Sequence, residues 1–252
     1  MHPFHLVLGL SCSLAAAGAV HAGVVCTCPG DFDGNGVIDG ADLGVLLSGW
    51  GQPGTDLTGD GTTNGADLGV LLAAWGPCAS PVNDLCANAQ PIVLGPSPVS
   101  VDFCTTGANT DGPAFTLGDC DNASNAFHDV WFQFVPAGDG SVVLSTCGAA
   151  DFDTIIAVYV SVIQGVGACP PTDGGFGLAS LIACDDDTAG CAGNTSRVEI
   201  NVSAGYVYKV RVGGFGGASG TSTLTATFKS VGNTCAGCHL PHRQRDRHRH
   251  DD

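Results

Sequence analysis

The stretch RVEINVSAGYVYKVRV, residues 197–212, decides the fold class of most of this chain. Val198, Ile200 and Val202 alternate with polar residues, which is typical of a strand with one buried and one solvated face. The turn signal SAG follows, and a second run rich in valine and tyrosine begins after it. The stretch therefore predicts two antiparallel strands joined by a hairpin.

Similar runs, rich in β-branched and aromatic residues, occupy residues 129–135, 141–147, 153–160 and 223–228. The segment PAGDG separates the first two runs and is another hairpin signal. Together these runs predict an all-β antiparallel sandwich, jelly-roll-like, over residues 84–230. A linker with two prolines, residues 77–83, precedes it.

Two acidic repeats lie before the linker: DFDGNGVIDGADLGVLLSGWG (31–51) and DLTGDGTTNGADLGVLLAAWG (56–76). Both contain the run GADLGVLL, and apolar residues recur in each at helical spacing. A glycine, Gly51 or Gly76, is expected to end each helix. Because neither short helix can bury its apolar stripe alone, the two are expected to pack on each other. The stripes consist of Leu43, Leu46, Leu47 and Trp50, and of Leu68, Leu71, Leu72 and Trp75.

The start of each repeat has the spacing of a calcium-binding loop, in which alternate residues supply oxygen ligands around a glycine turn. The predicted ligands of the first ion are Asp31, Asp33, Asn35, the Val37 carbonyl, Asp39 and Asp42. Those of the second are Asp56, Thr58, Asp60, the Thr62 carbonyl, Asn64 and Asp67. The second loop has fewer carboxylates, so a weaker site is expected. A solvated acidic turn is the alternative, but two copies in register, each followed by the same helix pattern, favour calcium.

Residues 30–76 resemble a type I dockerin, because both loops and both helices match that family's pattern. The resemblance implies a small all-α pair of calcium-binding loop-helix repeats that docks a cohesin-like domain of another protein. It also implies partner contacts at the tenth and eleventh loop positions, here Gly40, Ala41, Gly65 and Ala66. The hydroxyl-bearing residues often found at these positions in the family are absent here, and the helices carry no Lys or Arg.

Residues 84–228 resemble the β-sandwich modules related to pre-peptidase C-terminal and CUB-like domains, through runs such as CGAADFDT and CDDDTAGC. The resemblance implies a noncatalytic role in binding or stability. Since dense carboxylates repel one another without a cation, a further calcium ion could bind here; the alternative is an acidic loop tip in water. The candidate ligands are Asp151, Asp153, Asp185, Asp186 and Asp187. Cys184 and Cys191 are expected to bond to each other or to nearby cysteines.

Composition and charge narrow the function classes. The formal net charge is −16, which disfavours nucleic acid and anionic lipid as partners. Residues 1–22 have the apolar core and small-residue end of a secretory signal peptide. No other apolar run is long enough for a membrane span. Removal of the signal takes Cys12 and leaves an even number of the 13 cysteines, so a secreted, disulfide-bonded protein is predicted.

Catalysis is not expected. The sequence has no GxSxG, HExxH, P-loop or dinucleotide-binding motif. Glu199 alternates with Val198 and Ile200, which places it on the solvated face of its strand. The alternative function is a polysaccharide-binding or polysaccharide-degrading component, because dockerins often accompany such enzymes. Its candidate sugar-stacking side chains are Trp131, Phe132, Tyr159, Tyr206 and Tyr208, although strand alternation puts several of them in the core.

The tail, residues 231–252, is predicted to be flexible. Its CAGCH sequence (235–239) matches the attachment pattern of a c-type haem. Haem is the least favoured alternative, because the tail offers few apolar residues for a pocket; a disulfide or a histidine metal site are the others. The whole chain is thus predicted to be multidomain, with a signal peptide (1–22), dockerin-like repeats (23–76), a linker (77–83), a β-sandwich (84–230) and a tail.

Overall fold

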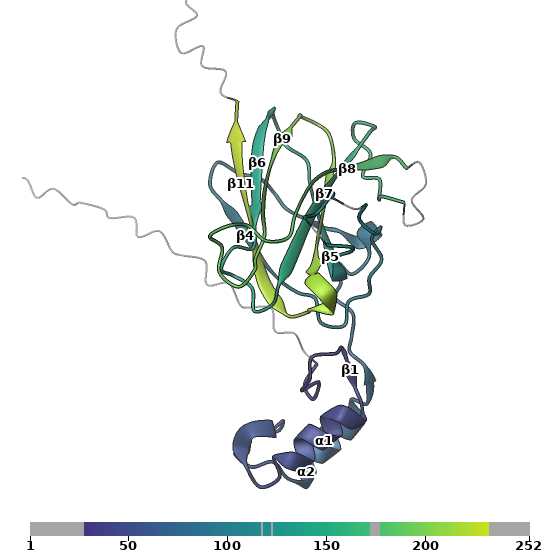
Figure 1. Ribbon diagram of the computed structural model, residues 1–252, viewed down its shortest axis with the longest axis vertical. Coiled ribbons are helices and arrows are strands. Elements are labelled where there is room, and N and C mark those ends of the chain that lie inside the picture. The colour runs from purple at the N-terminus through teal and green to yellow at the C-terminus, as the bar shows by residue number, and fades with distance from the viewer. Residues whose placement is uncertain (1–27, 117, 122, 172–176, 232–252) are drawn as a thin grey trace, which may run out of the picture.

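The computed structural model describes residues 28–116, 118–121, 123–171 and 177–231. Most of them form a β-sandwich, and a smaller N-terminal unit with two short helices lies at one end of it (Figure 1). The predicted signal peptide and the CAGCH segment lie outside the described residues. Within the described residues, none of the helices has the length and apolar character needed to span a bilayer.

The predicted β-sandwich is confirmed, and it consists of two sheets. The first has the order β3-β5-β10-β7-β8 and the second the order β4-β11-β6-β9. All neighbours within them pair antiparallel except β3 and β5, which pair parallel. The first sheet contains β3 (Gln90–Pro91), β5 (Phe127–Phe134), β7 (Thr154–Ser161), β8 (Ala179–Asp185) and β10 (Tyr208–Gly214). The second contains β4 (Val99–Cys104), β6 (Gly140–Ser145), β9 (Arg197–Val202) and β11 (Thr221–Ser230).

The alternation in β9 is confirmed. Val198, Ile200 and Val202 are buried in the core between the two sheets, and Glu199 is exposed. Side chains from the facing strands complete this core, including Phe132. Each fully buried aliphatic or aromatic side chain contributes about 1.5–3 kcal/mol by leaving water. The core thus follows from the period-two pattern of the strands.

Both predicted hairpins are wrong. β9 pairs with β6, whereas β10 pairs with β5 and β7, so the turn at 203–205 carries the chain from one sheet to the other. The PAGDG segment likewise joins β5 in the first sheet to β6 in the second. A turn signal specifies a chain reversal but not the lateral neighbour of each strand. Here the reversal across the sandwich buries one apolar face of each strand against the other sheet.

The outer face of the five-stranded sheet is also buried. Trp131, Ala157 and Tyr159 point to that side and form a second cluster with residues of the covering loops. Lys209 therefore lies in a largely buried position, although it alternates with core valines as a solvated residue would. Its ammonium group donates to the Gln133 side chain at 2.8 Å and to the Cys86 carbonyl at 3.2 Å. Burial lowers the pKa of Lys209.

Arg211, two residues along β10, is completely buried beside Asp129 of β5. Its Nε donates to the Asp129 carboxylate, and the two side chains form an ion pair with no exposed surface. The other guanidinium nitrogens donate to the Pro113 carbonyl at 2.8 Å, the Asn125 side chain at 2.8 Å and the Ala126 carbonyl at 2.7 Å. The ion pair thus joins β10 to β5, and the other hydrogen bonds of Arg211 attach the loop before β5 to the outer face of the sheet.

The predicted all-α pair of repeats is wrong as a fold class. Among the described residues the α-helices are α1 (Gly40–Ser48) and α2 (Gly65–Ala73), each of nine residues, and the chain is mostly β. The N-terminal unit also contains an antiparallel pair, β1 (Val37–Ile38) with β2 (Gly76–Pro77), and a 3-10 turn, η1 (Pro53–Thr55). The physical reason is that each nine-residue helix has only about two and a half turns. The rest of each repeat is held by hydrogen bonds to aspartate side chains.

Each helix begins at a capping box, with Asp39 and Asn64 as the N-caps. Leu46 and Leu71 are fully buried and pack with Ile38. Leu43 and Leu68 are partly buried against the same cluster, whereas the leucine and tryptophan at the end of each stripe are exposed. The expected helix packing therefore holds for only part of each stripe. The exposed fractions are 50% for Leu47, 48% for Trp50, 51% for Leu72 and 49% for Trp75.

The disulfide prediction is confirmed. Cys28–Cys78 closes the N-terminal unit, and Cys86–Cys169, Cys120–Cys184 and Cys147–Cys191 lie in the sandwich. Cys184 and Cys191 thus bond to other cysteines rather than to each other. Cys104 is disulfide-bonded as well. Such a set is typical of proteins that fold in an oxidising compartment.

Candidate metal centres

The first acidic loop brings three of its predicted ligands together. Carboxylate oxygens of Asp31, Asp33 and Asp42 lie within 4.8 Å of one another. Two oxygens bound to one calcium ion at about 2.3–2.6 Å lie up to about 5 Å apart, so this spacing fits one ion. Asn35 and Asp39 also make local contacts: the Asn35 Oδ1 accepts from the Val37 amide at 2.7 Å, and Asp39 caps α1.

Backbone amides surround the first carboxylate of this loop. Asp31 accepts hydrogen bonds from Gly34, Asn35 and Gly36 at 2.9, 3.1 and 2.9 Å. Gly36 has a φ of 82°, which only glycine adopts readily, so the sixth loop position needs it. Burial raises the pKa of Asp31 despite these hydrogen bonds. The loop is therefore shaped to hold a carboxylate in place at its centre.

The second loop repeats this arrangement. Asp56 accepts from Gly59, Asp60 and Gly61 at 2.8, 3.3 and 2.5 Å. Asp67, fully buried, accepts from the amides of Leu57, Thr58 and Asn64 at 2.9, 2.9 and 2.7 Å. Burial opposes ionisation of Asp67, but the hydrogen bonds outweigh it and lower its pKa to about 2. Among the described residues, the carboxylate groups close enough to share an ion include those of the first loop but not of the second.

The predicted partner-binding residues lie in the first turns of the helices. Gly40 and Ala41 begin α1, Gly65 and Ala66 begin α2, and all four are exposed. They are available for contact, but they offer little side-chain surface. The larger exposed apolar side chains lie near the other end of each helix, in Trp50 and Trp75.

A third acidic cluster forms in the β-sandwich. Carboxylate oxygens of Asp153, Asp186 and Asp187 lie within 4.8 Å of one another. The other two candidates are engaged elsewhere: Asp151 accepts from the Thr221 amide and hydroxyl, both at 2.7 Å. Asp185 accepts from the Thr188 hydroxyl at 2.5 Å and the Arg197 amide at 2.9 Å. The structure therefore brings together three of the five candidate ligands.

This cluster is electrostatically unfavourable when it holds only carboxylates. Burial, then the charges of Asp153 and Asp187, raise the pKa of Asp186 from its ordinary 3.8 to about 7. Burial likewise raises the pKa of Asp153. Within the described part of the chain, the ion pairs are Arg197–Glu199 and Arg211–Asp129, so no basic side chain there pairs with the cluster.

Four of the five proposed sugar-stacking side chains are buried, and the fifth, Tyr206, is half-buried. Trp131, Phe132, Tyr159 and Tyr208 are each at most 4% exposed, and Tyr206 packs against the core. The interpretation of these aromatic residues as a stacking platform is therefore wrong. Strand alternation already places several of these aromatic residues in the core, and the covered outer face of the five-stranded sheet buries Trp131 and Tyr159 as well.

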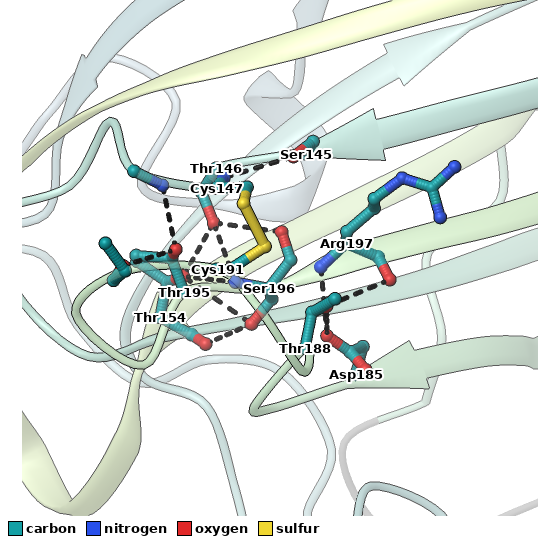
Figure 2. Close-up of a disulfide and its surroundings, with 12 residues drawn as sticks. Ser145, Thr146, Cys147, Thr154, Asp185, Thr188, Cys191, Thr195, Ser196 and Arg197 are labelled. Atoms are coloured by element: carbon teal, nitrogen blue, oxygen red, sulfur yellow. Dashed lines mark hydrogen bonds between the residues drawn. A yellow bond between two sulfur atoms is a disulfide. The ribbon is translucent and has the colours of Figure 1, made fainter.

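The sequence reasoning also missed a buried hydroxyl cluster beside the acidic one. Thr146, Thr154 and Ser196 are completely buried around the Cys147–Cys191 disulfide (Figure 2). The Thr146 and Thr154 hydroxyls are 2.7 Å apart. Serine and threonine are so common in this chain that their burial has no local sequence signal.

Comparison with known proteins gives one family match. Residues 82–162 match a family model described as galactose binding domain-like. This match agrees with the β-sandwich part of the predicted architecture and does not include the acidic repeats. No curated protein sequence matches the chain.

Solved structures also match about half of this chain. The pre-peptidase C-terminal domain of a collagenase from Bacillus anthracis is 13% identical, with a TM-score of 0.31, over 56% of this chain and 94% of that one. CorA, a surface-associated copper-binding protein of Methylomicrobium album BG8, is 9% identical, with a TM-score of 0.32, over 52% of this chain and 93% of that one. A GH26-CBM35 mannanase of Podospora anserina is 15% identical, with a TM-score of 0.23, over 54% of this chain and 28% of that one.

Proposed function

We propose that this chain is a secreted, noncatalytic binding protein whose N-terminal repeats bind two calcium ions and then dock a protein partner. One observation carries the proposal. The same hydrogen-bonded acidic loop occurs twice, and each copy leads into a helix that leaves a leucine and a tryptophan half-exposed. Repetition of both loop and exposed surface is expected of a functional module rather than of two unrelated acidic turns.

The donor set fits calcium. The loops offer carboxylate, amide, hydroxyl and carbonyl oxygens, which are hard ligands suited to a hard cation. Asp42 and Asp67 are fully buried, and each joins its loop to the first turn of the following helix through backbone hydrogen bonds. An ion bound to either carboxylate would therefore fix the helix relative to its loop. Extracellular calcium is the expected source.

The exposed leucine–tryptophan pairs support docking. Leu47 with Trp50, and Leu72 with Trp75, occupy equivalent positions in the two repeats. Half-exposed tryptophans are costly in water and are enriched among residues that dominate protein–protein affinity. The complementary partner has apolar pockets for these side chains and a basic rim that matches the acidic chain. A cohesin-like domain, implied by the dockerin resemblance, is the partner we propose.

Docking is tested with the full chain and a type I cohesin domain as the probe. We expect surface plasmon resonance to detect binding in calcium and none in chelator. Replacing both tryptophans, Trp50→Ala with Trp75→Ala, is expected to weaken binding at least tenfold, or about 1.4 kcal/mol. Phe215→Ala is the control, because Phe215 is 43% exposed but lies in the sandwich. Equal binding by the tryptophan variant would remove the docking surface from the proposal.

Saccharide binding by the sandwich is a second candidate function. It is supported by the galactose binding domain-like family match, and by a groove of about 320 Å³ lined by β7–β10, which includes Glu199 and Asn201. Carboxylate and amide side chains are suited to sugar hydroxyls. We expect co-sedimentation with insoluble glycans to fall when Asn201→Ala and Glu199→Gln are combined. Asp139→Asn, an exposed change outside the groove, is the control. If the unchanged protein does not co-sediment, this candidate is excluded for the glycans used.

A further inference from the structure

The pairing of β7 with β8 explains why three distant aspartates meet. These strands are antiparallel, and Ile156 of β7 lies opposite Asp185 of β8. The residue just before β7 and the residues just after β8 consequently lie at the same end of the sheet. Asp153 directly precedes β7, and Asp186 and Asp187 directly follow β8. Their convergence is thus a result of strand register, not of sequence proximity.

The carboxylate of Asp186 needs a partner that the described residues do not supply. Asp186 is 5% exposed, and its Oδ1 is buried without a hydrogen-bond partner among the described residues. The Oδ1 of Asp153 is also buried without a hydrogen-bond partner among the described residues. A buried, unpaired carboxylate oxygen is unfavourable. The Asn194 side chain forms a hydrogen bond with the Asp153 carboxylate, but the carboxylates of Asp153, Asp186 and Asp187 still lie within 4.8 Å of one another. A cation among these oxygens would satisfy both atoms and remove the repulsion.

The backbone that carries these aspartates is held rigidly. The Ser196 hydroxyl lies 2.6 Å from the Asp186 carbonyl and also within hydrogen-bonding distance of the Thr154 carbonyl. The Cys147–Cys191 disulfide braces the same loop (Figure 2). Both ligand-bearing segments are therefore positioned by buried contacts next to the cluster. Such a fixed arrangement lowers the cost of ordering ligands around an ion.

We propose that Asp153, Asp186 and Asp187 bind one calcium ion at the shared end of β7 and β8. All three ligands are carboxylates, which select a hard cation. Calcium accepts irregular sets of six to eight oxygens with water completing the shell, whereas magnesium demands a compact octahedron. The ion would cross-link the start of β7 to the loop that follows β8. This site is separate from the N-terminal repeats and does not depend on the function proposed for them.

The proposal is tested by measuring, with equilibrium dialysis in excess magnesium, how many calcium ions the full chain binds. We expect three ions per chain for the unchanged protein and one fewer for Asp186→Asn. Asp187→Asn is the second variant, because Asp187 is exposed and its replacement leaves the buried packing intact. It is expected to weaken the same site at least tenfold. Asp102→Asn is the matched control, since Asp102 lies on β4 of the other sheet and Asn keeps an acceptor for its contact with Thr223.

The outcomes separate this site from the repeats. If the unchanged protein binds one ion and both Asp186→Asn and Asp187→Asn lose it, the sandwich site is supported and calcium binding by the repeats is overturned. If the unchanged protein binds two ions and neither variant loses one, the sandwich site is overturned and the repeats are the calcium-binding module. Loss of an ion in the Asp102→Asn control would also overturn the assignment, because the effect would then follow total charge rather than these ligands.

Discussion

Replacing Asp129 with alanine is expected to lower the free energy of unfolding of the β-sandwich by about 3–5 kcal/mol. The change leaves the Arg211 guanidinium completely buried and without its counter-charge. It also removes the acceptor of the Asp111 and Gly112 amides, at 3.1 and 3.2 Å. Urea unfolding followed by far-ultraviolet circular dichroism measures the effect.

Two further variants test the cause. Glu199→Ala removes the exposed ion pair with Arg197, at 3.3 Å, and is expected to cost less than about 1 kcal/mol. Combining Asp129→Leu with Arg211→Met removes both buried charges and is expected to recover part of the loss. Equal losses of unfolding free energy in Asp129→Ala and Glu199→Ala would contradict the role assigned to the buried ion pair.

Removing calcium is expected to unfold α1 and α2 while the sandwich stays folded. The clustered carboxylates of the first loop would then repel one another, and nine-residue helices are too short to persist by propensity alone. Calcium at one hundred times its dissociation constant would stabilise a site by about 2.7 kcal/mol. Hydrogen exchange on the full chain, with and without chelator, measures the protection of both helices and of β5 and β10.

Variants of the loops distinguish ion binding from helix capping. Asp31→Asn with Asp56→Asn keeps an acceptor for the loop amides but removes one charge from each loop. We expect this pair to abolish the calcium-dependent protection of the helices. Asp139→Asn, an exposed change in the sandwich, should leave it unaltered. Full protection of both helices in chelator would show that the Cys28–Cys78 disulfide and the Leu46–Leu71 contact suffice without calcium.

The sequence by itself determined the local structure of this protein. Alternation over a few residues predicts β9, and the GADLGVLL runs with their capping residues predict α1 and α2. The acidic loops also follow from local spacing, because their hydrogen bonds join residues three to five positions apart. These interactions join residues that are close in the chain, so a local sequence pattern can predict them.

Only the tertiary structure decided which strands became neighbours, and with them the sites. The covered outer face of the five-stranded sheet buried Arg211 and Trp131, whereas alternation alone left their surroundings open. The register of β7 on β8 selected Asp153, Asp186 and Asp187 from five candidates. The physical reason is the separation along the chain of the residues that interact. Strand partners meet across tens of residues, and their choice depends on how all apolar faces are buried at once, which no short stretch specifies.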